Sequence, residues 1–136
     1  MAGGNALDGV VVLDLTRVLA GPLCTQMLGD MGAEVIKVEH PGRGDDTRHW
    51  GPPFADTEAA YFLGVNRNKK SLALDFKSPA GLQVLKKLVK KSDIVIDNFK
   101  PGLLDKLGLT SDWFETEAEA VIRCSITGYG TKGPNG

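Results

Sequence analysis

The sequence predicts an α/β fold, a parallel sheet with helices on its flanks. Short β-branched runs alternate with stretches of helical periodicity along the chain, and this alternation is typical of sheets built from βαβ units. The length of 136 residues suits a single domain with a buried core. A hydrophobic fraction of 42% with 24% charged residues is ordinary for a globular domain.

The first βαβ unit is predicted near the N-terminus. Residues 9–15, GVVVLDL, form a β-branched run that indicates a buried strand. Pro22 suits the first turn of the helix that follows, and Gly32 suits its end. This helix carries four large apolar residues on one side: Leu23, Met27, Leu28 and Met31. Residues 35–39, VIKVE, then indicate a second strand, parallel to the first.

A long irregular segment follows, over residues 40–64, with the stretch HPGRGDDTRHWGPPF. Loops of this length in compact domains are usually functional or disordered, and its aromatic and histidine residues favour function. The alternating run at 71–76, SLALDF, indicates another strand.

The C-terminal part of the chain continues the alternation. Ser78 is an N-cap candidate and Pro79 an N1 residue for a helix, whose apolar face carries Leu82, Leu85, Leu88 and Val89. The remaining elements are a strand, two short helices and a last strand, predicted at 94–96, 101–107, 110–117 and 121–126.

Composition excludes several classes of function. A net charge of −1 argues against broad nucleic-acid binding, and no apolar run reaches the roughly 18 residues of a membrane span. The start of the sequence, MAGGNALDG, lacks the pattern of a secretory signal. Cys24 and Cys124 are far apart in sequence and are expected as reduced thiols.

A Rossmann-like sheet raises the possibility of dinucleotide binding. The sequence after the first strand contains no G-x-G-x-x-G, so the backbone approach to a pyrophosphate is missing, although Glu39 stands where a ribose-binding acid would be expected. His40 and His49 lie on a glycine-rich and proline-rich loop without known ligand spacing, so no metal site is predicted.

A cluster of cations lies in VNRNKKSLALDFKSP, residues 65–79. Arg67, Lys69 and Lys70 lie within four positions, and Lys77 follows the predicted strand. Donors gathered at strand ends can form a crevice for phosphate. Lysines can equally keep a strand edge soluble. The pattern alone leaves both interpretations open.

Four segments of the chain carry a specific family resemblance. They read LDGVVVLDLTRVLAGPLCTQMLGDMGAEVIKVEHPGRGDDTRHWGPP, NRNKKSLALDFKSPAG, DIVIDNFKPGLLDKLGL and IRCSITGYGTKGP. Together, and in this order, they resemble the class III CoA-transferases, a family that includes formyl-CoA transferase and carnitine CoA-transferases. The succinyl-CoA:glutarate (hydroxymethylglutarate) transferases are the most similar members. The α-methylacyl-CoA racemases share several motifs, but the GDDTRHWGPPF loop resembles the transferase branch.

The resemblance implies where coenzyme A would bind. The matching positions are Val18, Leu19, Ala20, His40, Leu74, Lys77, Asn98, Phe99 and Lys106. His40 stands where formyl-CoA transferase has an arginine, and a histidine near pH 7 is a weaker partner for phosphate. Lys106 also replaces an arginine, which keeps the charge but loses the bidentate fork. Trp50 matches an aromatic residue that borders the acyl pocket.

The resemblance also implies a reaction, the transfer of CoA between an acyl-CoA and a carboxylic acid, with a dicarboxylic acid as the favoured acceptor. An aspartate would attack the thioester and pass through an aspartyl-CoA intermediate. That aspartate is expected beyond Gly136. Residues 1–136 would therefore be the N-terminal, CoA-binding part of the transferase domain, truncated before the catalytic segment and inactive alone.

Further expectations come from the same resemblance. CoA or acyl-CoA is expected as a substrate, with no covalently bound cofactor, and the full-length enzyme as an interlocked homodimer in the cytoplasm or the mitochondrial matrix. Two alternatives remain: the 2-methylacyl-CoA racemase branch of the family, and a stand-alone module that binds CoA or a nucleotide.

Overall fold

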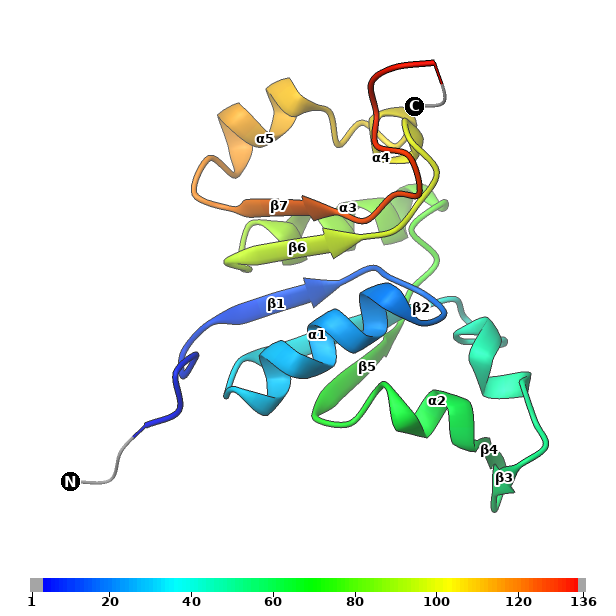
Figure 1. The fold of residues 1–136 in the computed structure, drawn as a ribbon. Coiled ribbons are helices and arrows are strands. Elements are labelled where there is room, and N and C mark those ends of the chain that lie inside the picture. The colour runs from blue at the N-terminus through cyan, green and yellow to red at the C-terminus, as the bar shows by residue number, and fades with distance from the viewer. Residues whose placement is uncertain (1–3, 135–136) are drawn as a thin grey trace.

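The structure is a computed structural model that describes residues 4–134, and it contains the predicted parallel sheet (Figure 1). Five parallel strands run in the spatial order β5-β2-β1-β6-β7. Their bounds are β1 Val11–Asp14, β2 Glu34–Glu39, β5 Lys69–Ala73, β6 Ile94–Asp97 and β7 Ile122–Ser125. The first strand is thus central. The chain adds β2 and then β5 on one side of β1, and it crosses back to add β6 and β7 on the other side, so the topological switch point lies between β1 and β6. Ligands bind at such switch points, outside the carboxyl ends of the strands.

Helices connect the parallel strands. The helices are α1 Ala20–Asp30, α2 Ala60–Gly64, α3 Pro79–Val89, α4 Leu103–Lys106 and α5 Ser111–Glu117. The Ser78 hydroxyl caps α3 by accepting a hydrogen bond from the Gly81 N–H at 3.1 Å, and Pro79 occupies the first turn, as predicted. Within residues 4–134, none of the helices is both long and apolar enough to span a membrane.

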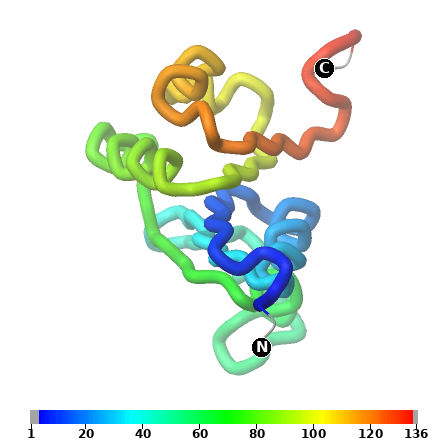
Figure 2. Tube along the Cα trace, turned by 90° about the vertical axis from the view of Figure 1, so that its left-hand side faces the viewer, coloured from blue at the N-terminus to red at the C-terminus, as the bar shows by residue number. Residues whose placement is uncertain are grey.

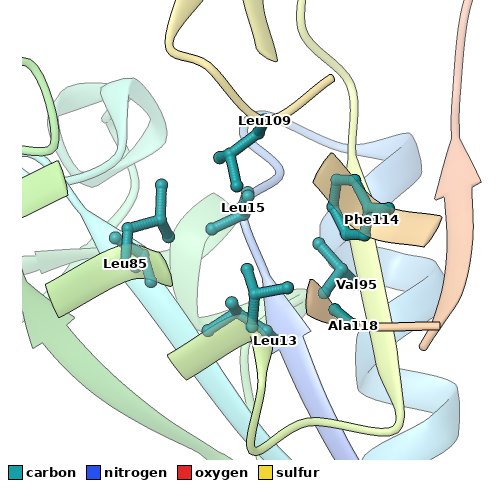
Figure 3. Close-up of a cluster of buried hydrophobic side chains, with 9 residues drawn as sticks. Leu13, Leu15, Leu85, Val95, Leu109, Phe114 and Ala118 are labelled. Atoms are coloured by element: carbon teal, nitrogen blue, oxygen red, sulfur yellow. The ribbon is translucent and has the colours of Figure 1, made fainter. Parts of the chain in front are cut away.

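The sheet has two apolar faces because side chains alternate along each strand. Val12, Val35 and Ile96 face α1, while Leu13 and Val95 face the opposite side. Figure 2 shows α3 and α5 on that opposite side of the sheet from α1. The larger core includes Leu85 of α3 and Phe114 of α5, and Figure 3 shows both side chains in one cluster with Leu13 and Leu15 of the central strand region. This doubly covered sheet confirms the predicted α/β class.

Only part of the predicted apolar side of α1 packs on the sheet, where Leu28 and Cys24 contact the core formed by Val12, Val35 and Ile96. Leu23, Met27 and Met31 are exposed by 39%, 56% and 43%. The buried residues of this helix are instead small or polar: Gly21, Pro22, Thr25 and Gln26. An apolar helical stripe normally faces the core, but here Thr25 faces it as well, because its hydroxyl donates to the buried Asp14 carboxylate.

The long segment after β2 contains short structured pieces. A 3₁₀ turn, η1, spans Asp46–His49, and two short strands, β3 Phe54–Ala55 and β4 Glu58–Ala59, pair as a hairpin before α2. The fifth strand of the chain begins at Lys69 and ends at Ala73, two to three residues earlier than predicted. Residues 74–77 consequently lie beyond the strand end, where they can contact a ligand.

Candidate functional site

One pocket lies at the carboxyl ends of four neighbouring strands. Leu15 follows β1, Val38 lies near the end of β2, Leu74 follows β5, and Phe99 follows β6. The other lining residues are Arg17, His40, Arg43, Asp75, Phe76, Lys77 and Leu103. The pocket thus lies at the edge of the sheet where the topology predicts a ligand.

The floor of this pocket is apolar and continuous with the larger core. Leu15 and Val38 belong to that core, and Leu74, Phe76 and Phe99 pack against it. The rings of Phe76 and Phe99 lie 5.8 Å apart with their planes tilted by 56°. Two aromatic rings on an apolar floor are suited to receiving a flat, weakly polar group such as a nucleobase.

Cations surround this apolar floor. Arg17, Arg43 and Lys77 line the pocket together with one carboxylate, Asp75, and Arg17 also lies 3.8 Å from the Asp46 carboxylate outside the lining. Guanidinium and ammonium groups donate charge-assisted hydrogen bonds to phosphate. The pocket therefore combines an aromatic floor with a positive rim, the chemistry that a nucleotide requires.

At the switch point, the loop after β1 and the loop after β6 are joined by a reciprocal pair of hydrogen bonds. The Arg17 N–H donates to Asn98 Oδ1 at 2.9 Å, and Asn98 Nδ2 donates to the Arg17 carbonyl at 2.7 Å. Val18 follows with a left-handed φ of 72°, a conformation that a β-branched residue rarely adopts. The loop after β1 is thus held in one shape against the loop after β6.

A buried ionic layer lies on the α1 side of the same strand ends. Asp14 accepts hydrogen bonds from Thr25 Oγ1 at 2.6 Å and Lys69 Nζ at 3.1 Å. Lys37 Nζ lies 2.9 Å from Asp45 Oδ2 and donates to the Thr16 carbonyl at 2.8 Å. Both ion pairs are almost fully shielded from solvent. Burial lowers the pKa of Lys69 to about 8, against the raising effect of the Asp14 charge.

The layer also supports the turn after β1 directly. Asp45 accepts long hydrogen bonds from the Val18 N–H, at 3.3 Å and 3.4 Å to its two oxygens. Burial alone would raise the pKa of Asp45, but the Thr47 N–H and the Lys37 charge hold that pKa below its ordinary value. Asp45 therefore remains an anion that binds both the Lys37 ammonium and the switch-point backbone.

Glu39 forms the outer part of the layer. Arg48 binds it in bidentate fashion, with Nε to Oε2 at 2.7 Å and Nη2 to Oε1 at 2.8 Å. Ser71 Oγ and the Asp45 N–H donate to the same carboxylate. Burial raises the pKa of Glu39, but these donors outweigh it and bring the pKa to about 2. This acid thus serves structure rather than ribose recognition.

The four cations of residues 65–79 have different surroundings in the structure. Arg67 pairs with Asp30, Lys69 with Asp14, and Lys70 with Glu34. These three cations are already neutralised within the chain, so the phosphate-crevice interpretation is not supported for them. Lys77 differs because it lines the pocket.

The residues that the family resemblance implies occupy several places. His40, Leu74, Lys77 and Phe99 line the one pocket, and Asn98 fastens the switch point beside it. The other implied residues do not line this pocket. Val18, Leu19 and Ala20 lie at the start of α1, Lys106 is exposed on α4, and the half-exposed Trp50 packs edge-on against Tyr61 at 5.4 Å.

Sequence reasoning missed three pocket residues with suitable chemistry, Arg17, Arg43 and Phe76. Arg17 and Phe76 each lie three residues past the end of a strand, β1 and β5 respectively, so the rule that ligands bind at the carboxyl ends of strands could have identified them. Arg43 lies within a loop, and no local signal indicates that it turns back toward the sheet. Within residues 4–134 there is no group of three or more His, Cys, Asp or Glu residues placed to hold a metal ion.

Comparison with known proteins agrees with this geometry. Residues 7–136 match the model of CoA-transferase family III, and the chain belongs to this family. Succinyl-CoA:glutarate CoA-transferase of Mus musculus is 57% identical over 128 residues, which cover 94% of this chain and 29% of that protein. Succinate–glutarate CoA-transferase of Agrobacterium fabrum is 48% identical over 134 residues, covering 94% and 34%.

A solved structure extends the likeness to three dimensions. The crystal structure of a CaiB/BaiF family protein from Brucella suis matches with a TM-score of 0.91 at 48% identity, over 97% of this chain and 36% of that one. The predicted family resemblance and fold class are both confirmed. The chain spans about a third of the length of these relatives.

Proposed function

We propose that this chain forms the part of a class III CoA-transferase that binds the nucleotide end of coenzyme A. The observation that carries the proposal is the pocket at the strand ends, where an aromatic floor from Phe76 and Phe99 lies beneath the cations Arg17, Arg43 and Lys77. Adenine would pack on the floor and the phosphates would lie on the rim. The site residues implied by the family resemblance are part of the same proposal.

Asn98 and Asp45 would act as positioning residues in this site. They hold the Arg17 and Val18 backbone through hydrogen bonds, so the loop after β1 is already fixed before a ligand arrives. A preorganised loop binds more tightly because little conformational entropy is lost on association.

For the whole protein we propose CoA transfer between an acyl-CoA and a dicarboxylic acid. The names of the relatives, succinyl-CoA:glutarate and succinate–glutarate CoA-transferase, support this substrate class. The nucleophilic aspartate of the proposed aspartyl-CoA route lies outside residues 1–136, so the isolated chain would bind CoA without turnover. The interlocked homodimer expected from the family belongs to the same proposal.

Calorimetric titration of the chain with CoA tests the proposal, together with the variant Phe99→Leu. Leucine preserves packing against the core but removes the aromatic ring, so CoA affinity should fall about tenfold, in the range expected for loss of base stacking. Tyr129→Leu is the matched control, because Tyr129 is 79% exposed and lies outside the pocket.

Two results would contradict the proposal. One is a wild-type chain that is folded by circular dichroism but gives no heat with CoA. The other is equal affinity for CoA in the wild type and in Phe99→Leu, which would remove this pocket as the adenine site.

A further inference from the structure

We propose that Arg43 is a specificity-determining residue that recognises the 3′-phosphate of coenzyme A, with Lys77 beside it. The inference rests on the proposed function and identifies which group of the ligand the positive rim distinguishes. It starts from the end of β2, where His40 is the first residue past the strand.

His40 itself is a poor candidate for the phosphate. Its Nδ1 lies 2.5 Å from the Pro41 carbonyl oxygen, so one of its two ring nitrogens is engaged within the loop. Only one ring nitrogen at position 40 is therefore left for a phosphate, where a guanidinium would present several donors.

The loop supplies a guanidinium three residues later. The Gly44 N–H donates to the His40 carbonyl at 2.9 Å and closes a turn, and both Gly42 and Gly44 adopt left-handed φ values, 83° and 65°. Glycine is required for such a turn because other residues rarely take positive φ. The turn brings Arg43 back over the end of β2, so that it lines the same pocket as His40.

The charges near the pocket leave Arg43 and Lys77 available. Arg17 lies 3.8 Å from Asp46, and Arg48 is held by Glu39 and Glu58. Among residues 4–134, neither Arg43 nor Lys77 forms a salt bridge. These two are the lining cations that can receive an external anion without first breaking an ion pair.

Two available cations suit a phosphomonoester, which offers both of them terminal oxygens on a single phosphorus. A monoester carries about two negative charges at neutral pH and presents three terminal oxygens. The guanidinium fork of Arg43 can bind two of those oxygens at once, while the Lys77 ammonium acts as a point charge. In coenzyme A the monoester is the 3′-phosphate on the ribose, next to the base that would occupy the aromatic floor.

The test compares CoA with 3′-dephospho-CoA by calorimetry in the wild type, Arg43→Gln and Arg67→Gln. Arg67 is the matched control because its side chain is exposed and pairs with Asp30 away from the pocket. The wild type should bind CoA about tenfold more tightly than the dephospho form, as expected for a charge-assisted contact. Arg43→Gln should lose that preference by weakening CoA alone, and Arg67→Gln should keep it.

The outcomes separate this inference from the proposed function. Equal weakening of both ligands in Arg43→Gln would overturn it, because the guanidinium would then contact the diphosphate or support the fold. An unchanged preference in Arg43→Gln, or an equal loss in Arg67→Gln, would also overturn it while leaving CoA binding intact. No binding of either ligand by the folded wild type would instead refute the proposed function, and this inference with it.

Discussion

Glu39 shows how single residues stabilise the strand ends. Its carboxylate accepts hydrogen bonds from Arg48, Ser71 and the Asp45 N–H while only 5% of the residue is exposed. Arg48 in turn lies over the Phe62 ring, 3.7 Å from its centre. A buried charge is tolerated when every lone pair is satisfied. Among the described residues, no buried side-chain nitrogen or oxygen lacks a partner.

The lowered pKa of Glu39 predicts a specific dependence of stability on pH. Folding lowers this pKa from 4.5 to about 2, so its contribution is fully present above pH 4.5 and is lost as the pH falls toward 2. Glu39→Gln should therefore lower the free energy of unfolding by about 3 kcal/mol at pH 7. Urea unfolding of both proteins from pH 7 to pH 2 measures the difference, which should shrink below pH 4.5. A difference that stays constant over this range would show that the ion pair is not the cause.

The sequence carried a partial signal for this ionic layer. Lys37 and Glu39 alternate with Ile36 and Val38 in VIKVE, a period of two that places both charges on one face. Their partners could not be predicted, because Asp45 and Arg48 reach them through an irregular loop. The same limit applies to the cation cluster, where Asp14, the partner of Lys69, lies 55 positions earlier.

At the scale of elements, α1 buries a mixed face. Leu28 packs against the core, Thr25 donates to the buried Asp14 carboxylate, and Gln26 donates to the Gly64 carbonyl at the end of α2. The spacing of Leu23, Met27, Leu28 and Met31 indicated a helix correctly, but only Leu28 of these four packs against the core. Periodicity identifies the element, whereas the burial of a polar side depends on partners from other strands.

The mixed buried face of α1 predicts different effects for two substitutions in this helix. Thr25→Val keeps the side-chain shape but leaves the Asp14 carboxylate short of a donor, so it should cost about 1–3 kcal/mol of stability. Met27→Gln, on the exposed apolar side, should change stability by less than about 0.5 kcal/mol. Thermal or urea unfolding of the two variants tests this directly. A larger loss in Met27→Gln than in Thr25→Val would mean that the apolar side is the one that stabilises the helix.

Other elements were predictable because their signals are local. Ser78 and Pro79 define the start of α3, and the Thr110 hydroxyl caps α5 by accepting from the Trp113 N–H at 3.2 Å. Strand limits were less accurate. The run at 71–76 alternates past the end of β5 at Ala73 because Leu74 and Phe76 pack toward the core from the following loop.

For the whole molecule, the strand order sets a gradient of stability. The central strand β1 is paired on both sides, by β2 and β6, whereas β7 is paired on one side and its Ile122 is 63% exposed. Hydrogen–deuterium exchange should therefore be slowest at Val12, Leu13 and Asp14 and faster along β7, since edge elements open with lower free energies. Equal protection of β7 and β1 amides would contradict this order.

The class of the fold was predictable at this scale, whereas the order of its strands was not. Short β-branched runs separated by helices imply a parallel sheet, but the sequence does not indicate that β6 pairs with β1 on the side away from β2. That single pairing brings Arg17 against Asn98 and completes the pocket with Phe99. Four of the pocket residues were implied by the family resemblance, and the others required this topology.

The hydrogen bonds between Arg17 and Asn98 at the switch point have a consequence for the order in which the fold can form during synthesis. Asn98 lies 81 positions after Arg17, so a ribosome must synthesise β1, β6 and everything between them before the loop after β1 can be fixed. Until then the nascent β1 lacks its β6 partner, although Lys69, the partner of Asp14, has already been synthesised. The pocket can therefore form only after β6 has joined the sheet, later than the ionic pairing on the α1 side.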